Sequence, residues 1–354
     1  MTAPVSGPVL VIGSGLIGAS VGLALRRAGV QVWLDDVDAV AVAEAVDRGA
    51  GEPWRPDAGQ PRLVVVAVPP DVAGPAMARA GDFPDATVTD VTSVKAEPLA
   101  EARAAGADPR RLVGGHPMAG RETSGAAAAR HDLFDDRVWV ISPLAESDPQ
   151  RVEDVRDLVV TCGAVPVMMA PEDHDRAVAL TSHAPQLLSS LLAARLLDAD
   201  PDAVAVSGQG LRDMTRIAGS DPRLWQSILN SNADSVADVL EAFARDLEGA
   251  ITRLRQREDL GDALARGVQG QRRIPGKHGA TATAYDLVPV IIKDEPGELA
   301  RLFVAAGGLE VNLEDVRIDH VLGKPSGLVE LSVRPEATTR LVEGLRALGF
   351  DVRA

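Results

Sequence analysis

The chain has 354 residues, a formal net charge of −15 and a single cysteine, Cys162. This length is sufficient for two or three domains, each with its own hydrophobic core. The excess of acidic residues argues against binding to nucleic acids or anionic membranes, because both carry negative charge. An anionic small substrate would therefore need a local cluster of arginine, lysine or histidine side chains.

A reducing cytoplasm is the compartment that the sequence favours. The single cysteine excludes an intramolecular disulfide and a cysteine-rich metal site, and no metal is predicted. No apolar run reaches the roughly 18 residues that cross a bilayer. The first residues, MTAPVSGPVLVIG, lack a basic region followed by an apolar stretch, so a secretory signal is not expected.

Residues 1–170 predict a dinucleotide-binding domain of the Rossmann type, an α/β fold. Short β-branched runs alternate with alanine-rich helical patterns, which indicates a parallel sheet covered by helices on both faces. The predicted strands are VLVIG (9–13), QVWLD (31–35), LVVVAVP (63–69), TVTDV (87–91), RLVGGHP (111–117), VWVIS (138–142) and VPVMM (165–169).

The rest of the chain predicts two further domains joined by a linker. Residues 171–271 predict an all-α substrate and dimerisation domain with two extended helical stretches, the first starting with proline and acids at PEDHD. Residues 272–284 are polar and contain glycine and proline, as a linker does. Residues 285–354 follow the order βαββαβ, which predicts a ferredoxin-like sandwich.

A glycine-rich motif follows the first predicted strand and points to a dinucleotide. In VLVIGSGLIG, the residues Gly13, Gly15 and Gly18 form the pattern G-x-G-x-x-G at the junction of a strand and a helix. The first glycine permits the tight turn, the second lets the pyrophosphate approach the backbone, and the third lets the helix meet the strand. The N–H groups at the start of the helix are expected to bind the phosphates.

Acidic residues after the second strand favour NAD over NADP. One carboxylate of Asp35 and Asp36 is expected to bind the ribose hydroxyls, and with Asp38 nearby a 2′-phosphate would be repelled. The alternative is a glycine turn with solvated surface acids. The predicted cofactor-binding residues are Gly13, Gly15, Leu16, Ile17, Gly18, Asp35, Asp36, Val68 and Ser93.

Four stretches that carry chemistry each follow a predicted strand: GSGLIG, AVPP, DVTSVK and GGHPMAG. Ligands of open α/β sheets collect beyond the carboxyl ends of the strands, so we expect these stretches to line one site. His116 is the candidate that accepts a proton or hydrogen bond from a substrate hydroxyl. Ser93 can touch both nicotinamide and substrate. The alternatives are that His116 is an ordinary loop histidine and that Ser93 caps the next helix.

The predicted all-α domain, residues 171–271 and called the helical segment below, contains the positive charge that an anionic substrate would need. Arg212 and Arg216 are four residues apart and so share a helix face, and arginine binds a carboxylate through two hydrogen bonds. The alternative for Arg212 is an ion pair with Asp213 or with a partner subunit. His183 precedes Pro185, which is expected to kink the helix and expose the imidazole. A buried, hydrogen-bonded histidine is the alternative.

Three other residues are interpreted as structural. We expect His174 to be a structural residue at a helix start, Lys95 to be a solvated first-turn residue, and Trp225 to pack in the core or at an interface.

Five segments together resemble the prephenate dehydrogenase family over about the first 260 residues, in the order that the family shows: GLIGASVGLAL, DVTSVK, GGHPMAGRETSG, PEDHDRAVALTSHAP and RDMTRIAGSDPRLW. The resemblance implies an oxidative decarboxylation in tyrosine biosynthesis. Hydride passes to NAD from the ring carbon that bears the 4-hydroxyl, and carbon dioxide leaves the opposite ring carbon. The product of prephenate is 4-hydroxyphenylpyruvate.

The resemblance also implies residue roles. His116 polarises the 4-hydroxyl, and Ser93 bridges that hydroxyl and the nicotinamide. The implied substrate-binding residues are Arg216, which binds a carboxylate, Arg212 beside it, His183, and Glu122 at the site entrance, which the adjoining subunit can supply.

Two positions depart from the family pattern. Arg121 stands where many members have serine or threonine, and Gln186 stands where many have histidine. The second departure leaves arogenate, which carries an amino group in place of the keto group and would give tyrosine directly, as an alternative substrate.

The resemblance further implies a homodimer formed through the helical domain and a C-terminal regulatory domain of the ACT type. Such a domain would bind an amino acid, with tyrosine as the expected feedback effector. The expected effector-binding residues are Gly297, in DEPGELARLF, and Asn312, at the start of the next strand. Ordinary turn and strand chemistry is the alternative for both, because the fold is shared by unrelated functions.

Two other functions compete with this interpretation. A β-hydroxyacid dehydrogenase has a similar domain order but uses a lysine from its helical domain, and this chain has no lysine between Lys95 and Lys277. A non-catalytic sensor of NAD and amino acids has no need for His116, Ser93 and Arg216 together.

Overall fold

The computed structural model describes residues 5–120, 125–274, 285–320 and 326–353. The chain forms two compact units, Met1–Arg245 and Asp246–Ala354, which are described separately below. Among the described residues, no helix has both the length and the apolar character needed to span a membrane.

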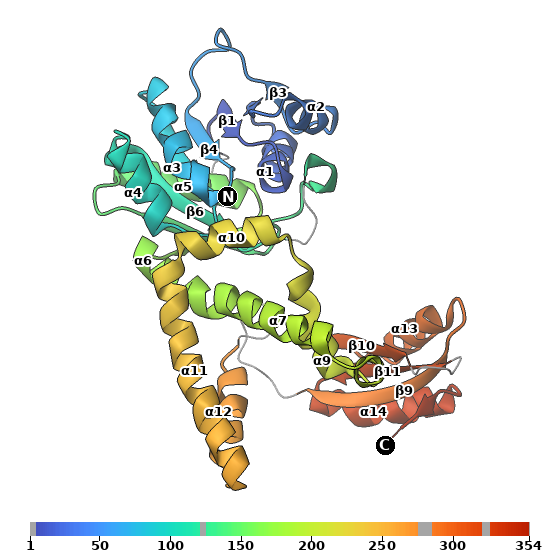
Figure 1. Ribbon diagram of the computed structural model, residues 1–354. Helices are drawn as coiled ribbons and strands as arrows, with labels where there is room; N and C mark the ends of the chain where they lie inside the picture. Colours follow the sequence, from blue (N-terminus) through green and yellow to red (C-terminus); the bar gives the residue numbers. More distant parts are fainter. Residues whose placement is uncertain (1–4, 121–124, 275–284, 321–325, 354) are drawn as a thin grey trace. The chain divides into compact units, whose positions relative to one another are not determined.

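The first unit is built on an eight-stranded sheet with the order β3-β2-β1-β4-β5-β6-β7-β8. Figure 1 labels β1, β3, β4 and β6 of this sheet. The seven predicted strands are all present, and the two-residue β3 is an additional strand that the sequence did not predict. The strands are β1 Val9–Ile12, β2 Val32–Asp35, β3 Glu52–Pro53, β4 Leu63–Val66, β5 Thr87–Asp90, β6 Leu112–Pro117, β7 Val138–Pro143 and β8 Val165–Met168.

Helices cover both faces of this sheet, as the apolar strands predict. Val9 and Val11 of β1 belong to one core cluster together with residues of α1 and α5, whereas Leu10 belongs to a second cluster with residues of α3 and α4. Alternate residues of a strand face opposite sides, so one apolar strand supplies both layers. The helices of this unit up to residue 161 are α1 Leu16–Arg27, α2 Ala39–Asp47, α3 Pro70–Arg79, α4 Ala96–Ala104 and α5 Pro149–Thr161.

One strand pair departs from the parallel arrangement. β6 runs antiparallel to β7, with His116 opposite Val140, while the other paired strands of the sheet are parallel. A parallel connection needs a crossover, usually an α-helix. The described part of the β6–β7 connection contains only the short 3₁₀ turn Ala126–Ala128. The carboxyl ends of β1, β4, β5 and β6 nevertheless share one edge, as expected.

The helical segment is more broken than its sequence indicates. A π-helical turn, Ala179–His183, separates α6 from α7, and Asn232 separates α10 from α11. Pro185 lacks an N–H group and its ring crowds the preceding turn, which explains a widened turn at this point. The helices are α6 Pro171–Val178, α7 Ala184–Ala194, α8 Pro201–Ala205, α9 Gln209–Thr215, α10 Pro222–Ser231, α11 Ala233–Gln256 and α12 Gly261–Gln271.

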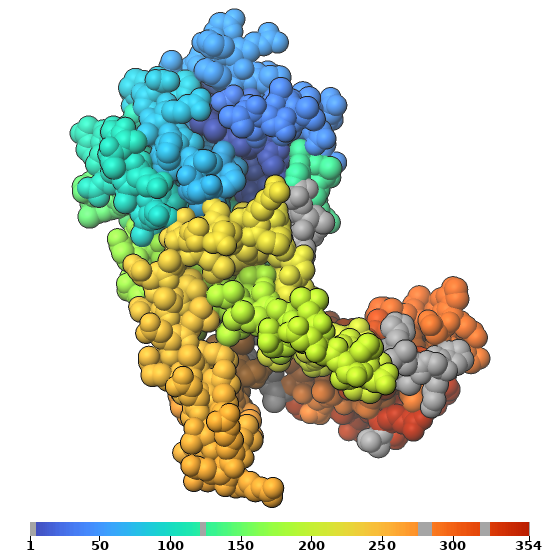
Figure 2. Space-filling view, viewed as in Figure 1, coloured from blue at the N-terminus to red at the C-terminus, as the bar shows by residue number. Residues whose placement is uncertain are grey.

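Helix α10 anchors the helical segment to the sheet. Figure 2 shows α10, in yellow, directly against the blue and cyan part of the chain that contains α3. At this contact the hydroxyl of Ser227 donates a hydrogen bond to Asp71 Oδ1 at 2.9 Å. Residues of α10 are thereby held beside the edge of the sheet where the candidate site lies.

The second unit contains the predicted βαββαβ fold. Its four strands are antiparallel in the order β10-β11-β9-β12. Leu302 of α13 and Leu341 of α14 share a core with Val290 of β9, so both helices pack against the sheet. The elements are β9 Asp286–Lys293, α13 Glu298–Gly308, β10 Asp315–His320, β11 Ser326–Val333, α14 Pro335–Ala347 and β12 Asp351–Val352.

Candidate active site

The glycine loop between β1 and α1 has the shape that a dinucleotide requires. Gly13 has a φ of +105°, and a Cβ atom there would lie 2.3 Å from the carbonyl oxygen of Ala67. A Cβ atom on Gly18 would lie 1.9 Å from the carbonyl oxygen of Gly13. A Cβ atom on Gly15 would meet no atom within 4 Å, so this position leaves space for a phosphate beside the backbone.

The groups around this loop fit the same ligand. Leu16 and Ile17 open α1, where the first N–H groups have no partner within the helix. Side-chain atom Cγ1 of Val68 lies 3.1 Å from where a Cβ of Gly13 would be.

The two candidate ribose-binding acids lie at the glycine loop but differ in their contacts. The backbone N–H of Gly13 donates to the carbonyl oxygen of Asp35 at 2.8 Å. The carboxylate of Asp36 accepts a 2.6 Å hydrogen bond from the N–H of Ser14. Asp38 instead caps α2 by accepting from the N–H of Val40. Asp36 is thus the acid whose carboxylate directly contacts the loop.

Lys95 is buried, and the prediction that it is solvated is wrong. Its side chain and that of Asp90 are both 0% exposed, and they form an ion pair. The ammonium also donates to Thr92 Oγ1 at 3.0 Å and to the carbonyl oxygen of Gly115 at 2.6 Å. Burial lowers the pKa of Lys95, and the charge of Asp90 opposes this shift. The side chain reaches Asp90 at the end of β5 and the carbonyl oxygen of Gly115 in β6. An unpaired charge would not be stable at such a buried position.

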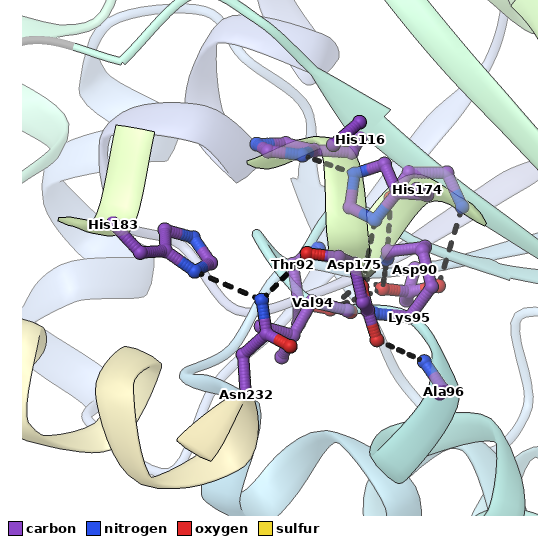
Figure 3. Close-up of polar contacts among 12 residues, drawn as sticks. Asp90, Thr92, Val94, Lys95, Ala96, His116, His174, Asp175, His183 and Asn232 are labelled. Carbon is purple, nitrogen blue, oxygen red and sulfur yellow. Dashed lines mark hydrogen bonds and ion pairs between the residues drawn. The ribbon is translucent and has the colours of Figure 1, made fainter. Parts of the chain in front are cut away.

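His116 lies near the end of β6 and contacts a second histidine. Its Nδ1 lies 2.8 Å from Nε2 of His174, and His174 Nδ1 lies 2.7 Å from Asp175 Oδ1 (Figure 3). Burial lowers the pKa of His116 well below its ordinary value, and His174, Lys95 and His183 lower it further. The imidazole is therefore neutral near pH 7 and can accept a hydrogen bond.

His174 belongs to this site, although the sequence indicated only a structural residue at a helix start. It is 1% exposed and lies in the first turn of α6. The neighbouring carboxylate of Asp175 accepts hydrogen bonds from the N–H groups of Lys95 and Ala96, both at 2.8 Å. Asp175 thus caps α4 and joins the helical segment to the sheet.

Ser93 is half-buried on the loop between Thr92 and Lys95. No side-chain hydrogen bond caps α4 from its own N-terminal residues, so the alternative role of Ser93 as a cap is not realised. The loop places Ser93 between two residues that contact the Asp90 carboxylate.

His183 is also buried, so the prediction that Pro185 exposes its imidazole is wrong. The side chain is 1% exposed, and Asn232 Nδ2 donates to its Nδ1 at 3.1 Å. The same amide donates to the backbone oxygen of Asp175 at 2.8 Å. Burial lowers the pKa of His183 to about 4. Because Nδ1 accepts, the neutral ring carries its hydrogen on Nε2.

Trp225 lies with its ring edge-on to His183, at 6.0 Å between centroids. It is half-buried on α10, as expected for a packing residue.

The two candidate arginines are exposed and lie close together in the chain. Arg212 is in the last turn of α9, and Arg216 follows that helix and begins a 3₁₀ turn, so one α-helical face does not run through both. Gln186 is buried on α7, and its amide donates to the carbonyl oxygen of Ile217 at 2.8 Å. It thereby holds the segment that carries Arg216. Glu122 and Arg121 lie outside the described residues.

The structure brings together His116 and His183, which the sequence assigned to the site, with six residues that it did not assign individually. These additional residues are Asp90, Thr92, Lys95, His174, Asp175 and Asn232. The doublet His174–Asp175 carried a usable signal, because a carboxylate beside a histidine often fixes the tautomer of its ring. Nothing in the sequence around Asn232 indicated a role in the site, because this residue lies within a long helical pattern.

A dinucleotide-shaped glycine loop and a neutral imidazole at the same sheet edge define an oxidoreductase of the dinucleotide-dependent class. The family model described as "Prephenate dehydrogenase, nucleotide-binding domain" matches residues 21–168, and "Prephenate dehydrogenase, dimerization domain" matches residues 170–269. The chain is 38% identical to "Probable prephenate dehydrogenase NovF" of Streptomyces niveus, over 95% of this chain and 97% of that one. It belongs to the prephenate dehydrogenase family.

Solved structures agree with this assignment. Prephenate dehydrogenase from A. aeolicus, in complex with hydroxyphenyl propionate and NAD+, superposes with a TM-score of 0.68 at 28% identity, over 77% of this chain and 98% of that one. Synechocystis arogenate dehydrogenase has a TM-score of 0.64 at 27% identity, over 75% and 98%. Both likenesses cover the greater part of the chain.

Proposed function

We propose that the protein catalyses the NAD-dependent oxidative decarboxylation of prephenate to 4-hydroxyphenylpyruvate. The observation that carries this proposal is a neutral, half-buried His116 at the end of β6, at the same sheet edge as the glycine loop. NAD bound at that loop would accept the hydride. The chain's own residues would bind and orient the substrate and polarise its hydroxyl.

His116 is proposed to accept a hydrogen bond from the 4-hydroxyl of the substrate. This contact increases electron density on the hydroxyl oxygen and favours departure of the hydride from the carbon that bears it. A protonated imidazole could not accept this bond, so the lowered pKa of His116 suits the role. Ser93 is proposed to bridge the same hydroxyl and the nicotinamide.

Charged and neutral donors are proposed to bind the rest of the substrate. Arg216 would bind a carboxylate, with Arg212 nearby, because guanidinium groups match carboxylates in geometry and charge. His183 would offer a neutral N–H donor. Glu122 at the entrance remains a prediction. For the cofactor, Asp36 is proposed as the ribose-binding acid.

The reaction is tested by measuring NADH formation with purified protein and either prephenate or arogenate. Reduction of NAD with prephenate is expected. Absence of NADH formation with both substrates, under conditions in which the protein binds NAD, would refute the enzymatic assignment. It would favour a non-catalytic sensor.

Arogenate is the second candidate substrate, and one contact favours considering it. The amide of Gln186 is buried and engaged with the carbonyl oxygen of Ile217, so this position offers no cationic imidazole to a keto-acid side chain. The ratio of kcat/KM for the two substrates decides between them.

A homodimer is proposed to form through the helical segment. On α11, four exposed apolar side chains recur at helical spacing and form one apolar face. They are Phe243, Leu247, Ile251 and Leu254, which are 46%, 49%, 38% and 61% exposed. Light scattering after size exclusion should give a dimer for the natural chain and a smaller species for Leu247→Glu. A natural chain that is monomeric at micromolar concentration would refute this.

The C-terminal unit is proposed to bind an amino-acid effector, with tyrosine as the candidate. Gly297 precedes α13 with a φ of +95°, and a Cβ atom there would meet nothing within 4 Å. Asn312 lies before β10 and donates to Glu314 Oε1 at 3.0 Å. Calorimetric titration with tyrosine, together with NADH assays at rising tyrosine concentration, tests this proposal.

A further inference from the structure

A line of three side chains leads from the helical segment to His116. Asp175 Oδ1 lies 2.7 Å from His174 Nδ1, and His174 Nε2 lies 2.8 Å from His116 Nδ1. His174 and Asp175 are 1% and 4% exposed, so water does not compete for these contacts. Figure 3 shows the side chains of His116, His174 and Asp175, with dashed lines for the contacts between them, near Lys95.

The hydrogen-bonding capacity of each group sets where the protons lie. The Asp175 carboxylate accepts from two backbone N–H groups, of Lys95 and Ala96, and so faces His174 as an acceptor as well. His174 Nδ1 must then carry the hydrogen of that contact. A neutral His174 consequently presents the lone pair of Nε2 to His116.

We propose that His174 and Asp175 are positioning residues that hold His116 in the tautomer with hydrogen on Nδ1. The Nε2 atom of His116 is then left with a lone pair for the substrate hydroxyl. This inference rests on the proposed function, in which His116 accepts that hydrogen bond. Neither positioning residue touches the substrate: they act through the imidazole that does.

The same arrangement supports His116 during the reaction. Any positive charge that develops on its ring as the hydroxyl polarises is met by the lone pair of His174 and, behind it, by the Asp175 carboxylate. His183 has the opposite tautomer, because Asn232 donates to its Nδ1. The site therefore contains one neutral imidazole that accepts and one that donates.

The tautomer can be read directly, without turnover, from protein labelled with ¹⁵N in its six histidines. Two-bond ¹H–¹⁵N correlation spectra distinguish a protonated ring nitrogen from one with a lone pair. The His116 signals are assigned by their loss in His116→Gln. We expect a protonated Nδ1 and a bare Nε2. A protonated Nε2, which a doubly protonated His174 donating to His116 would produce, overturns the proposal.

Kinetic variants test the role of His174 itself. His174→Phe keeps an aromatic ring but removes the acceptor, and it should lower kcat by about 10-fold or more while KM for NAD stays within about 2-fold, since a whole general base contributes ~10²–10⁴-fold. His174→Gln places an amide oxygen where Nε2 was and should recover most of kcat. His131→Phe, at an exposed histidine, is the matched control and should match the natural chain.

The outcomes separate this inference from the proposed function. If His174→Phe leaves kcat and the His116 tautomer unchanged, the positioning role is wrong even though the enzyme is active. If the natural chain turns over neither substrate, the proposed function fails, while the tautomer spectrum still decides the inference.

Discussion

Removing the charge of Lys95 should destabilise the first unit strongly. Lys95 and Asp90 are both fully buried, and the ammonium is the only cationic partner of that carboxylate among the contacts the structure describes. Lys95→Met keeps most of the length of the side chain but leaves Asp90 with only neutral partners: the hydroxyl of Thr92, the N–H of Thr92 at 3.0 Å and the N–H of Gly115 at 3.3 Å. The buried negative charge would then be uncompensated.

The size of the effect follows from the cost of breaking a buried ion pair. Removing one partner typically costs about 3–5 kcal/mol, whereas replacing both partners with apolar residues is often neutral. Domains have only about 5–15 kcal/mol of unfolding free energy, so the single variant should lose a large fraction. The double variant Asp90→Leu/Lys95→Met should recover most of that loss. Lys293→Met, at an exposed lysine of the second unit, is the control.

Urea unfolding followed by tryptophan fluorescence measures this effect selectively. All four tryptophans, at positions 33, 54, 139 and 225, lie in the first unit. A decrease of less than about 1 kcal/mol in the unfolding free energy of Lys95→Met would refute the reasoning, because an unpaired buried carboxylate costs more than this. Failure of the double variant to recover stability would show that the ammonium contact with the Gly115 carbonyl matters more than the ion pair.

Four further predictions concern the site and its cofactor loop. His116→Asn should lower kcat by ~10²–10⁴-fold with nearly unchanged NAD affinity; a kcat within 10-fold of the natural chain would contradict the proposed role. Arg216→Ala should mainly raise KM for the substrate, and an unaltered KM removes Arg216 from the carboxylate site. Gly18→Ala should weaken NAD binding measured by calorimetry, because the new Cβ would lie 1.9 Å from the Gly13 oxygen, whereas Gly81→Ala, with nothing within 4 Å, should not. His183 has a pKa of about 4 in the folded state against 6.5 ordinarily, so the folded state binds fewer protons between these values and stability falls as pH falls through this window. The loss should reach about 2–4 kcal/mol by pH 4 and be absent in His183→Gln, and equal acid sensitivity of both proteins would count against it.

The local patterns of the sequence predicted the architecture well. Apolar runs identified seven strands of the first sheet, and the order βαββαβ identified the second unit. The steric need for glycine at Gly13 and Gly18 is equally local, because it arises from the turn between β1 and α1. Predictions of this kind depend on residues that are neighbours in the chain.

The environment of single polar residues was predicted less well. Lys95 was expected in solvent and His183 was expected to be exposed, yet both are buried and hydrogen-bonded. A helix pattern gives the direction of a side chain but not what another segment places against it. Lys95 is buried because β5 and β6 supply Asp90 and the Gly115 carbonyl as partners.

The sequence by itself determined the α/β class, the strand order along the chain, the glycine loop and the candidate imidazole, because periodicity and glycine stereochemistry act over short chain distances. Only the tertiary structure decided which polar groups meet His116. Its contact with His174 joins residues 58 apart in the chain, and the cap of α4 by Asp175 joins residues 80 apart. Buried polar groups must find partners, and the packing of the helical segment on the sheet selects them.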